Sequence, residues 1–439
     1  MDREKPMQNT LRRHRELGPI YQRIIFGQPI VFVAGHDLVA EINNDKLWEK
    51  HVGRPIEALR SVAGDALFTA YNDEPNWQKA HNILTPAFTQ SAMRSYHDTM
   101  LDTARELVAS WDSKSDRFDV ADEMSKLTLE TIGRTGFGYA FNAFTNEETD
   151  PFVTSMLRVL DYAQSAGMPI PGIGALVGRK EARRQREDLA YLNSVVRDAI
   201  ERRRANGNPG ATDLLDRMLS GVDEESGESL DEMNMIRQVI TFMVAGHETT
   251  AAVLSFTLWF LATHPEVAQR ARAEVDEMWP GGETPDVKFE QVPKLRYLRR
   301  VLDESMRIWP TSPGYFRRAR TDTTIGGKYE FKAGEWALVV VLAMHRDPAV
   351  WGENADEFDP DRFLPENVKA RPAQAYKPFG TGTRSCIGRQ FAIHEMVMAL
   401  ALLVHRYEFD VEPGYELKVK EQLTLRPDGF RMSVRRRDR

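Results

Sequence analysis

The longest apolar segment of the chain runs from Val239 to Leu261 and predicts a buried helix. Glu248 is its only formal charge, and the segment is long enough to span a bilayer. Its middle nevertheless carries a polar patch, His247–Thr250, and apolar residues occupy every face around that patch. We therefore expect the core helix of a large soluble protein, with a membrane span as the alternative.

The rest of the pattern divides into five segments with different periodicities. The first, from about Asp73 to Glu277, predicts helices with polar breaks, and the second, Pro313–Val341, predicts short strands with glycine turns. An irregular stretch, Asp347–Gly388, is followed by one more helix from about Cys386 to His405 and by short terminal strands over Tyr407–Arg435. No repeat and no Gly/Ser-rich linker separates them. We expect one large, mainly α domain with a small β portion over residues 1–439.

Composition narrows the function classes. Hydrophobic residues make up 42% of the 439 positions, which excludes a disordered or collagen-like chain. The net charge of −7 (58 − 65) is spread along the chain and gives no nucleic-acid footprint. One cysteine excludes a disulfide framework and a multi-thiolate metal site. The charged start, MDREKPMQNTLRRHREL, predicts neither a signal peptide nor an anchor, so we expect a cytoplasmic protein.

The single cysteine, Cys386, lies in a glycine-rich loop, Phe379-Gly-Thr-Gly-Thr-Arg-Ser-Cys-Ile-Gly388. A lone cysteine is ordinarily a small buried hydrophobe. Here the glycines allow the backbone to approach a flat, bulky group, and a helix that begins near Cys386 would lower the pKa of the thiol. Arg384 is suited to a carboxylate. Together these features favour a thiolate on haem iron, with Arg384 on a porphyrin propionate.

This loop resembles that of the cytochrome P450 monooxygenases, whose pattern F-x-x-G-x-R-x-C-x-G is met by Phe379, Gly382, Arg384, Cys386 and Gly388. The resemblance implies the cytochrome P450 fold and haem b with Cys386 as the axial thiolate ligand. It also implies insertion of one oxygen atom from O₂ into a C–H bond of an apolar substrate.

The polar patch of the long apolar helix reads Ala245-Gly-His-Glu-Thr-Thr250. Taken alone, Gly246 and a neighbouring threonine predict a helix kink. The patch also resembles the family motif A-G-x-E-T. That resemblance implies a groove for dioxygen and water where the helix opens at Gly246, with Thr249 and Glu248 delivering protons.

A charged pair, Glu304 and Arg307, is spaced i, i+3 on an apolar helix. Such a pair is ordinarily a weak surface contact. Together with Asp359-Pro-Asp-Arg-Phe363 it resembles the family's E-x-x-R and P-E-R-F motifs, although position 361 is Asp rather than Glu. The resemblance implies that Glu304, Arg307 and Arg362 form a buried network that holds the cysteine loop.

Further haem contacts follow from the resemblance. Trp77 and His81 are spaced i, i+4 where the family has W-x-x-x-R, which implies a propionate contact; an aromatic–polar surface pair is the alternative. Arg317 matches a family arginine that often reaches a propionate, with Arg318 beside it as the other possible register.

Within the family the chain is most similar to the self-sufficient bacterial fatty-acid hydroxylases, in which the haem domain is fused to a flavin reductase. The similarity extends from about Lys5 to the C-terminal strands. It implies a substrate pocket lined by Phe68, Ala245, Gly314 and Leu423; core packing is the alternative for Phe68 and Leu423.

The chain departs from those hydroxylases where they carry an arginine and a tyrosine for the fatty-acid carboxylate. Gln28 and Phe32 stand there. An amide and a phenyl ring cannot replace a charged fork. We therefore expect weak binding of free fatty acids, or a natural substrate that is neutral or differently charged.

No reductase segment is present in the 439 residues, so we expect either an excised haem domain or a stand-alone enzyme. Its partner would be a flavodoxin-like or ferredoxin protein supplied with electrons by NAD(P)H. Lys377, Arg384 and Arg389 would make the cysteine face basic and suited to an acidic partner; scattered solvated charges are the alternative. A peroxide-driven peroxygenase, a non-catalytic haem protein and a haem-free helical scaffold remain rival functions.

Overall fold

The computed structural model describes residues 5–25, 27–146, 148–166, 177–206 and 213–438. Helices account for 57% of the chain and strands for 12%, which confirms the predicted mainly α class. The chain forms two compact units. The first takes in Met1–His51, Ala104–Ser125 and Thr249–Arg439, and the second takes in Val52–Thr103 and Lys126–Glu248. That these units act as one haem domain stays a prediction.

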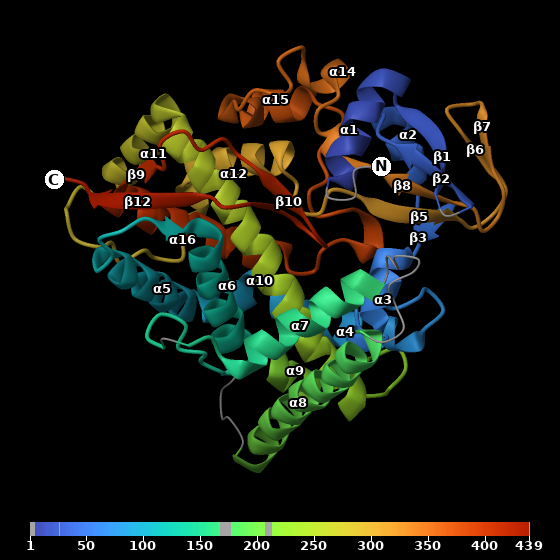
Figure 1. Cartoon of the computed structure of the whole chain (residues 1–439), viewed down its shortest axis with the longest axis horizontal. Coiled ribbons are helices and arrows are strands. Elements are labelled where there is room, and N and C mark those ends of the chain that lie inside the picture. The colour runs from blue at the N-terminus through green and yellow to red at the C-terminus, as the bar shows by residue number, and fades with distance from the viewer. Residues whose placement is uncertain (1–4, 26, 147, 167–176, 207–212, 439) are drawn as a thin grey trace. The chain divides into compact units, whose positions relative to one another are not determined.

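A five-stranded sheet organises one part of the first unit (Figure 1). Its strand order is β1-β2-β8-β5-β3, with every neighbouring pair antiparallel except β2 and β8. The bounds are β1 (Ile20–Ile25), β2 (Gln28–Val33), β3 (Trp48–Lys50), β5 (Tyr315–Ala319) and β8 (Trp336–Val339). Fully buried Val33, Trp48 and Val339 belong to the core beneath it. The sequence pattern predicted β5 and β8 but missed β1, β2 and β3.

The other strands of the first unit form one three-stranded sheet, β4-β12-β9, and two hairpins, β6-β7 and β10-β11. Their bounds are β4 (Phe118–Asp119), β6 (Thr323–Ile325), β7 (Tyr329–Phe331), β9 (Tyr407–Val411), β10 (Val419–Glu421), β11 (Leu425–Pro427) and β12 (Arg431–Arg436). Gly326 and Gly327 both have positive φ in the first hairpin, as their predicted turn requires. The predicted terminal strands are confirmed.

Helices surround these sheets in the first unit. They are α1 (Pro6–Leu17), α2 (His36–Ile42), α11 (Pro265–Met278), α12 (Arg296–Ile308), α13 (Val341–Met344), α14 (Pro348–Trp351), α15 (Pro365–Ala370) and α16 (Arg389–Arg406), with 3₁₀ turns η2 (Val292–Lys294), η3 (Pro360–Phe363) and η4 (Gly382–Arg384). Helix α16 begins at Arg389, three residues later than predicted, because Ser385 and Cys386 still belong to the loop.

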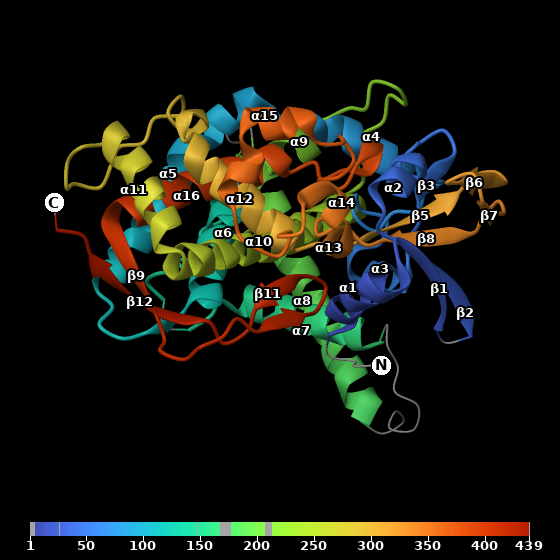
Figure 2. The same cartoon turned by 90° about the horizontal axis from the view of Figure 1, so that it is seen from above.

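The regular elements in the described part of the second unit are all helices, joined by irregular loops. Its helices are α3 (Arg54–Ala63), α4 (Pro75–Leu84), α7 (Pro151–Ala166), α8 (Val177–Asn206) and α9 (Leu214–Ser220), with the 3₁₀ turn η1 (Thr85–Phe88). Helices α7 and α8 pack side by side (Figures 1 and 2). Asp213 caps α9 and, with Asp216, pairs with Arg203 of α8.

Three long helices have residues in both units: α5 (Gln90–Asp112), α6 (Val120–Phe137) and α10 (Glu232–Thr263). Helix α10 is the long apolar helix of the sequence. It is long and apolar enough to cross a membrane, but 72% of its most apolar window is buried inside the protein. That burial is typical of a core helix in a soluble protein.

Candidate active site

The cysteine loop is held by its own backbone. The amide of Cys386 donates to Phe379 O at 2.9 Å, and the amide of Ser385 donates to Gly382 O at 3.1 Å. Gly380 and Gly382 have φ of 72° and 66°, a region that L side chains rarely adopt. A Cβ at Gly382 would also collide with the carboxylate of Asp45. Glycine is therefore required at Gly382 for two separate reasons.

The environment of the Cys386 thiol differs from the prediction. The side chain is exposed, yet the protein around it is dense enough that burial raises the pKa of the thiol. The amide of Gly388 and the charge of Arg389 act in the predicted direction but are weaker. The predicted lowered pKa is thus wrong, because α16 begins too late and desolvation outweighs both effects. An accessible thiol inside dense protein suits a ligand to a bound metal, which itself favours the thiolate.

Arg384 lies at the end of η4, close to the last residue of β3, Lys50. Burial, and then the charge of Arg384, hold the pKa of Lys50 well below its usual range. An anionic group beside Lys50 and Arg384 would offset both effects and favour the charged form of Lys50, and a haem propionate fits this place. Sequence reasoning found Arg384 and missed Lys50, because no local pattern indicates that β3 ends beside the cysteine loop.

Arg317 is buried in the sheet and engaged with the chain itself. Its Nη2 donates to Asp45 Oδ1 at 2.7 Å and to Trp48 O at 3.1 Å, and its Nε donates to Ile42 O at 3.2 Å. Arg317 therefore holds Asp45 against Gly382. Arg318 pairs instead with Glu49. A propionate contact of Arg317 stays a prediction.

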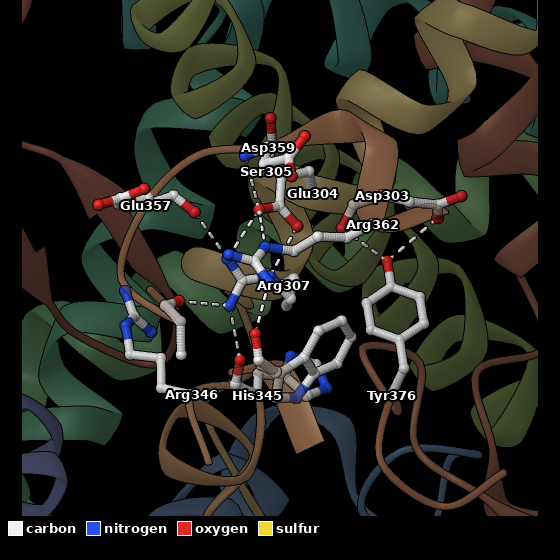
Figure 3. A network of polar contacts seen from close by, with 12 residues as sticks. Asp303, Glu304, Ser305, Arg307, His345, Arg346, Glu357, Asp359, Arg362 and Tyr376 are labelled. Carbon is white, nitrogen blue, oxygen red and sulfur yellow. Dashed lines mark hydrogen bonds and ion pairs between the residues drawn. The ribbon is translucent and has the colours of Figure 1, made fainter. Parts of the chain in front are cut away.

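The predicted charge network is assembled in the first unit (Figure 3). Arg307 donates through Nε and Nη2 to the two carboxylate oxygens of Glu304, at 2.6 and 2.7 Å, and both residues are fully buried. Arg362 Nε lies 3.5 Å from Glu304 Oε1. Burial raises the pKa of Glu304, whereas Arg307 and Arg362 favour its charged form. Arg307 also donates to three backbone carbonyls, through Nη1 to His345 O and Ala355 O and through Nη2 to Glu357 O.

Asp361, which stands where the family motif P-E-R-F has glutamate, also has a structural role. Arg270 Nη2 and Arg300 Nη1 lie 2.8 and 2.9 Å from Asp361 Oδ1. These arginines lower the pKa of Asp361, with the hydrogen bond from Arg270 as the largest cause. The shorter carboxylate thus ties η3 to α11 and α12.

One face of α10 is accessible in the middle of an otherwise buried helix. Ala245 is exposed, and Glu248 and Thr249, at i+3 and i+4 on the same face, are half-buried. The predicted opening at Gly246 does not break the helix, which is continuous from Glu232 to Thr263. A Cβ at Gly246 would lie 3.2 Å from Ile132 Cγ1, so close packing against α6 explains this glycine. The helix therefore has no break at Gly246, and the groove for dioxygen and water at this position stays a prediction.

The remaining predicted residues of the second unit lie on or before α4. The Trp77 and His81 rings stack with centroids 5.0 Å apart and an angle of 27° between them. Phe68 exposes 39% of its surface, unusual for a phenylalanine in a folded protein. Its exposure disfavours simple core packing and agrees with a ligand-facing role.

Two predicted pocket residues lie in the first unit. A Cβ at Gly314 would approach Val339 O to 2.6 Å, so this glycine is needed for the contact with β8. Leu423 lies half-buried in the turn between β10 and β11. Whether either lines a substrate pocket stays a prediction.

These observations fit a haem. Among the described residues, no group of three or more His, Cys, Asp and Glu side chains could hold a metal ion. The accessible thiol, the glycine loop and the Lys50–Arg384 pair supply one axial ligand, room for a flat group and a place for its carboxylates.

Comparisons with known proteins agree with this fit. The family described as "Cytochrome P450" matches residues 1–434. "Bifunctional cytochrome P450/NADPH--P450 reductase 2" of Bacillus subtilis is 42% identical over 439 residues, which is 100% of this chain and 41% of that protein. "Self-sufficient cytochrome P450 monooxygenase CYP505E1" of Aspergillus niger is 38% identical over 100% of this chain and 40% of that protein.

A crystal structure of a cytochrome P450, CYP102L1, superposes with a TM-score of 0.94 at 46% identity, covering 99% of this chain and 98% of the other. The chain spans about two fifths of the length of the curated relatives named above.

Proposed function

Because this chain belongs to the cytochrome P450 family, in which a cysteine thiolate holds the haem iron, we propose that it is a monooxygenase acting on an apolar substrate. Cys386 is its only cysteine and hence its thiolate ligand. Haem held in this way supplies O₂ activation and O–O cleavage. The observation that carries the proposal is the accessible thiol of Cys386 in its backbone-held glycine loop.

The chain's own residues divide the work. Arg384 and Lys50 hold the propionate carboxylates. Thr249 donates a proton through its hydroxyl. Glu248, one residue before it, takes up protons from solvent and passes them to that hydroxyl. The small side chain of Ala245 leaves space on the same helix face for the reacting part of the substrate, and Phe68 supplies an apolar contact.

We infer that the substrate lacks a carboxylate that must be anchored at β2. Phe32 is buried, stacked on Tyr21 with centroids 5.1 Å apart, so it packs in the core. Gln28 is exposed at the start of the strand and carries no charge. A spectral titration with a long-chain fatty acid and its methyl ester tests this: we expect the ester to bind at least as tightly, and a strong preference for the free acid would overturn it.

We also propose that the electrons come from NAD(P)H through a flavin reductase, in the cytoplasm. The relatives named above include bifunctional P450/NADPH–P450 reductases. Arg389 is exposed and Lys377 half-buried, and both flank the cysteine loop. Charge reversal at Arg389 should slow reduction by an acidic partner and weaken its salt dependence; unchanged rates would exclude docking there.

The test of the function is a stoichiometry. With a reductase partner and a substrate that shifts the spin state of the haem, NAD(P)H and O₂ should be consumed together with formation of a hydroxylated product. Turnover by peroxide that far exceeds turnover by any reductase would favour the peroxygenase alternative. Absence of substrate-dependent NAD(P)H consumption across a broad compound panel would favour a non-catalytic haem protein.

A further inference from the structure

His345 borders the buried ion-pair network (Figure 3) and also contacts Lys377, two residues before the cysteine loop. It follows the last residue of α13, and no part of it is exposed. Its carbonyl oxygen accepts a hydrogen bond from Arg307 Nη1 at 2.8 Å. Its ring nitrogen Nε2 accepts a hydrogen bond from the backbone N–H of Lys377 at 2.9 Å. One residue thus touches α12 through its backbone and the start of the cysteine loop through its side chain.

The hydrogen bonds continue from Lys377 to Cys386. The carbonyl of Lys377 accepts from the amide of Gly380 at 3.2 Å, and the carbonyl of Phe379 accepts from the amide of Cys386 at 2.9 Å. The position of Lys377 therefore fixes the turn from Lys377 to Gly380. This turn contains Phe379, whose carbonyl oxygen accepts the hydrogen bond from Cys386.

A second anchor holds the residue before Lys377. The hydroxyl of Tyr376 lies 2.9 Å from Asp303 O and 3.0 Å from Asp303 Oδ1, again on α12. The His345 and Tyr376 rings lie against each other, with centroids 5.1 Å apart. The two anchors reach the same short segment by independent hydrogen bonds, so each can be removed while the other remains.

The protonation state of the ring suits this contact. Burial, and then the Arg307 charge, lower the pKa of His345 to about 3, against a weaker opposing effect of the nearby Arg307 and Met306 carbonyls. The ring is therefore neutral near neutral pH. Because Nε2 accepts the amide hydrogen, the proton is on Nδ1. The other polar groups near the ring are the carbonyls of Arg307 and Met306, and the bond from Lys377 is the ring's hydrogen bond to the segment that leads into the cysteine loop.

We propose that His345 is a positioning residue for the Cys386 thiolate. Its carbonyl is held by Arg307 of the Glu304–Arg307 network, and its ring in turn holds the amide of Lys377, which precedes the cysteine loop. The inference deepens the proposed function, since it takes Cys386 as the haem ligand. The lost contact would let the loop shift and the thiolate separate from iron more easily, without any change at a group that touches the substrate.

The variants His345→Gln and His345→Asn distinguish the effect of the hydrogen bond to Lys377 from the effects of side-chain polarity and volume. In His345→Gln the amide oxygen can occupy the place of Nε2 and accept from Lys377, whereas in His345→Asn it reaches only the place of Nδ1. His345→Leu removes the acceptor altogether, and Tyr376→Phe removes the parallel anchor. His14→Gln serves as a control, because His14 is also a buried histidine with a lowered pKa but bonds Gly18 O, far along the chain from the loop.

Two readouts apply to the purified holoprotein: hydrogen exchange at the Lys377 amide, and the fraction of the ferrous–carbonyl complex that shows the red-shifted Soret band of a thiolate ligand. We expect His345→Leu and His345→Asn to speed exchange at Lys377 about three- to tenfold and to lower the thiolate fraction. His345→Gln should restore both, and His14→Gln should change neither.

Equal behaviour of the Gln and Asn variants, or an unchanged Lys377 amide and band in His345→Leu, would overturn the inference. If His345→Leu fails to fold, the comparison of His345→Gln with His345→Asn in the same two measurements still tests the inference. If the unmodified protein itself lacks the thiolate band, the proposed function fails instead, and exchange at Lys377 still reports on the hydrogen bond.

Discussion

Single residues show most sharply what the cysteine loop requires. Gly382 has a positive φ and also lies against Asp45, which Arg317 fixes in place. The sequence motif identified this glycine, but the motif contains neither Asp45 nor Arg317. Local sequence patterns cannot reveal an ion pair whose members both lie more than 60 residues from the loop in sequence, since only the folded chain brings it there.

Gly382→Ala tests these two causes separately. We expect a loss of about 1–3 kcal/mol in the free energy of unfolding, from backbone strain and from the collision with Asp45. Gly414→Ala is a matched control, because Gly414 has φ of 77° but has no other atoms within 4 Å of its Cβ position. If both variants lose the same stability in urea unfolding, the Asp45 contact contributes nothing.

Thr249→Ala tests the proton-delivery role on α10. Removal of the hydroxyl should lower product formed per NAD(P)H consumed, by about tenfold or more, with released peroxide making up the difference. Thr250→Ala is the control, because Thr250 is buried away from the accessible face. Product yield and peroxide are measured together in the reductase-coupled assay. Equal coupling in the two variants would contradict the assignment.

At the scale of elements, the pattern predicted those with long or strongly periodic sequences. The core helix α10 and the terminal strands β9–β12 were predicted as such. Strand β3 is only three residues long, and its partner β5 lies about 270 residues later, so neither length nor periodicity could reveal it. With β3 unseen, Lys50 could not be placed beside Arg384. The start of α16 was misplaced because the helical periodicity continues into the loop.

The Glu304–Arg307 pair joins α12 to η3 and to the loop beyond α13. Arg307→Ala leaves a buried carboxylate without its main partner, so we expect a loss of about 3–5 kcal/mol in the free energy of unfolding. Arg183→Ala is the matched control, because its pair with Glu187 is exposed to solvent, and it should cause a much smaller loss. Equal losses in chemical denaturation would show that the buried network is not a stabilising element.

At the scale of the whole molecule, the acid side of the stability curve should reflect two buried histidines. Desolvation is the largest cause that lowers the pKa of His14 to about 4 and of His345 to about 3. Well above pH 6.5 both histidines are largely neutral in the folded and in the unfolded state. As the pH falls below 6.5, these two histidines bind protons in the unfolded chain but stay neutral in the folded chain, so the free energy of unfolding decreases.

From about pH 7.5 to about pH 5, each histidine should cost about 2 kcal/mol of unfolding free energy. The measurement is urea unfolding across this range, where most carboxylates remain ionised. The double variant His14→Gln with His345→Gln should make the profile less steep, while His405, whose pKa burial also lowers, still contributes. A profile as steep as that of the unmodified protein would assign the acid sensitivity to other groups.

The central claim is the bond between the Cys386 sulfur and haem iron, and the spectrum of the ferrous–carbonyl complex tests it most directly. The unmodified protein should show the red-shifted Soret band that a thiolate ligand gives, and Cys386→Ser, which removes the chain's only thiol, should abolish it while haem is still bound. A Cys386→Ser protein that keeps the red-shifted band would contradict the account.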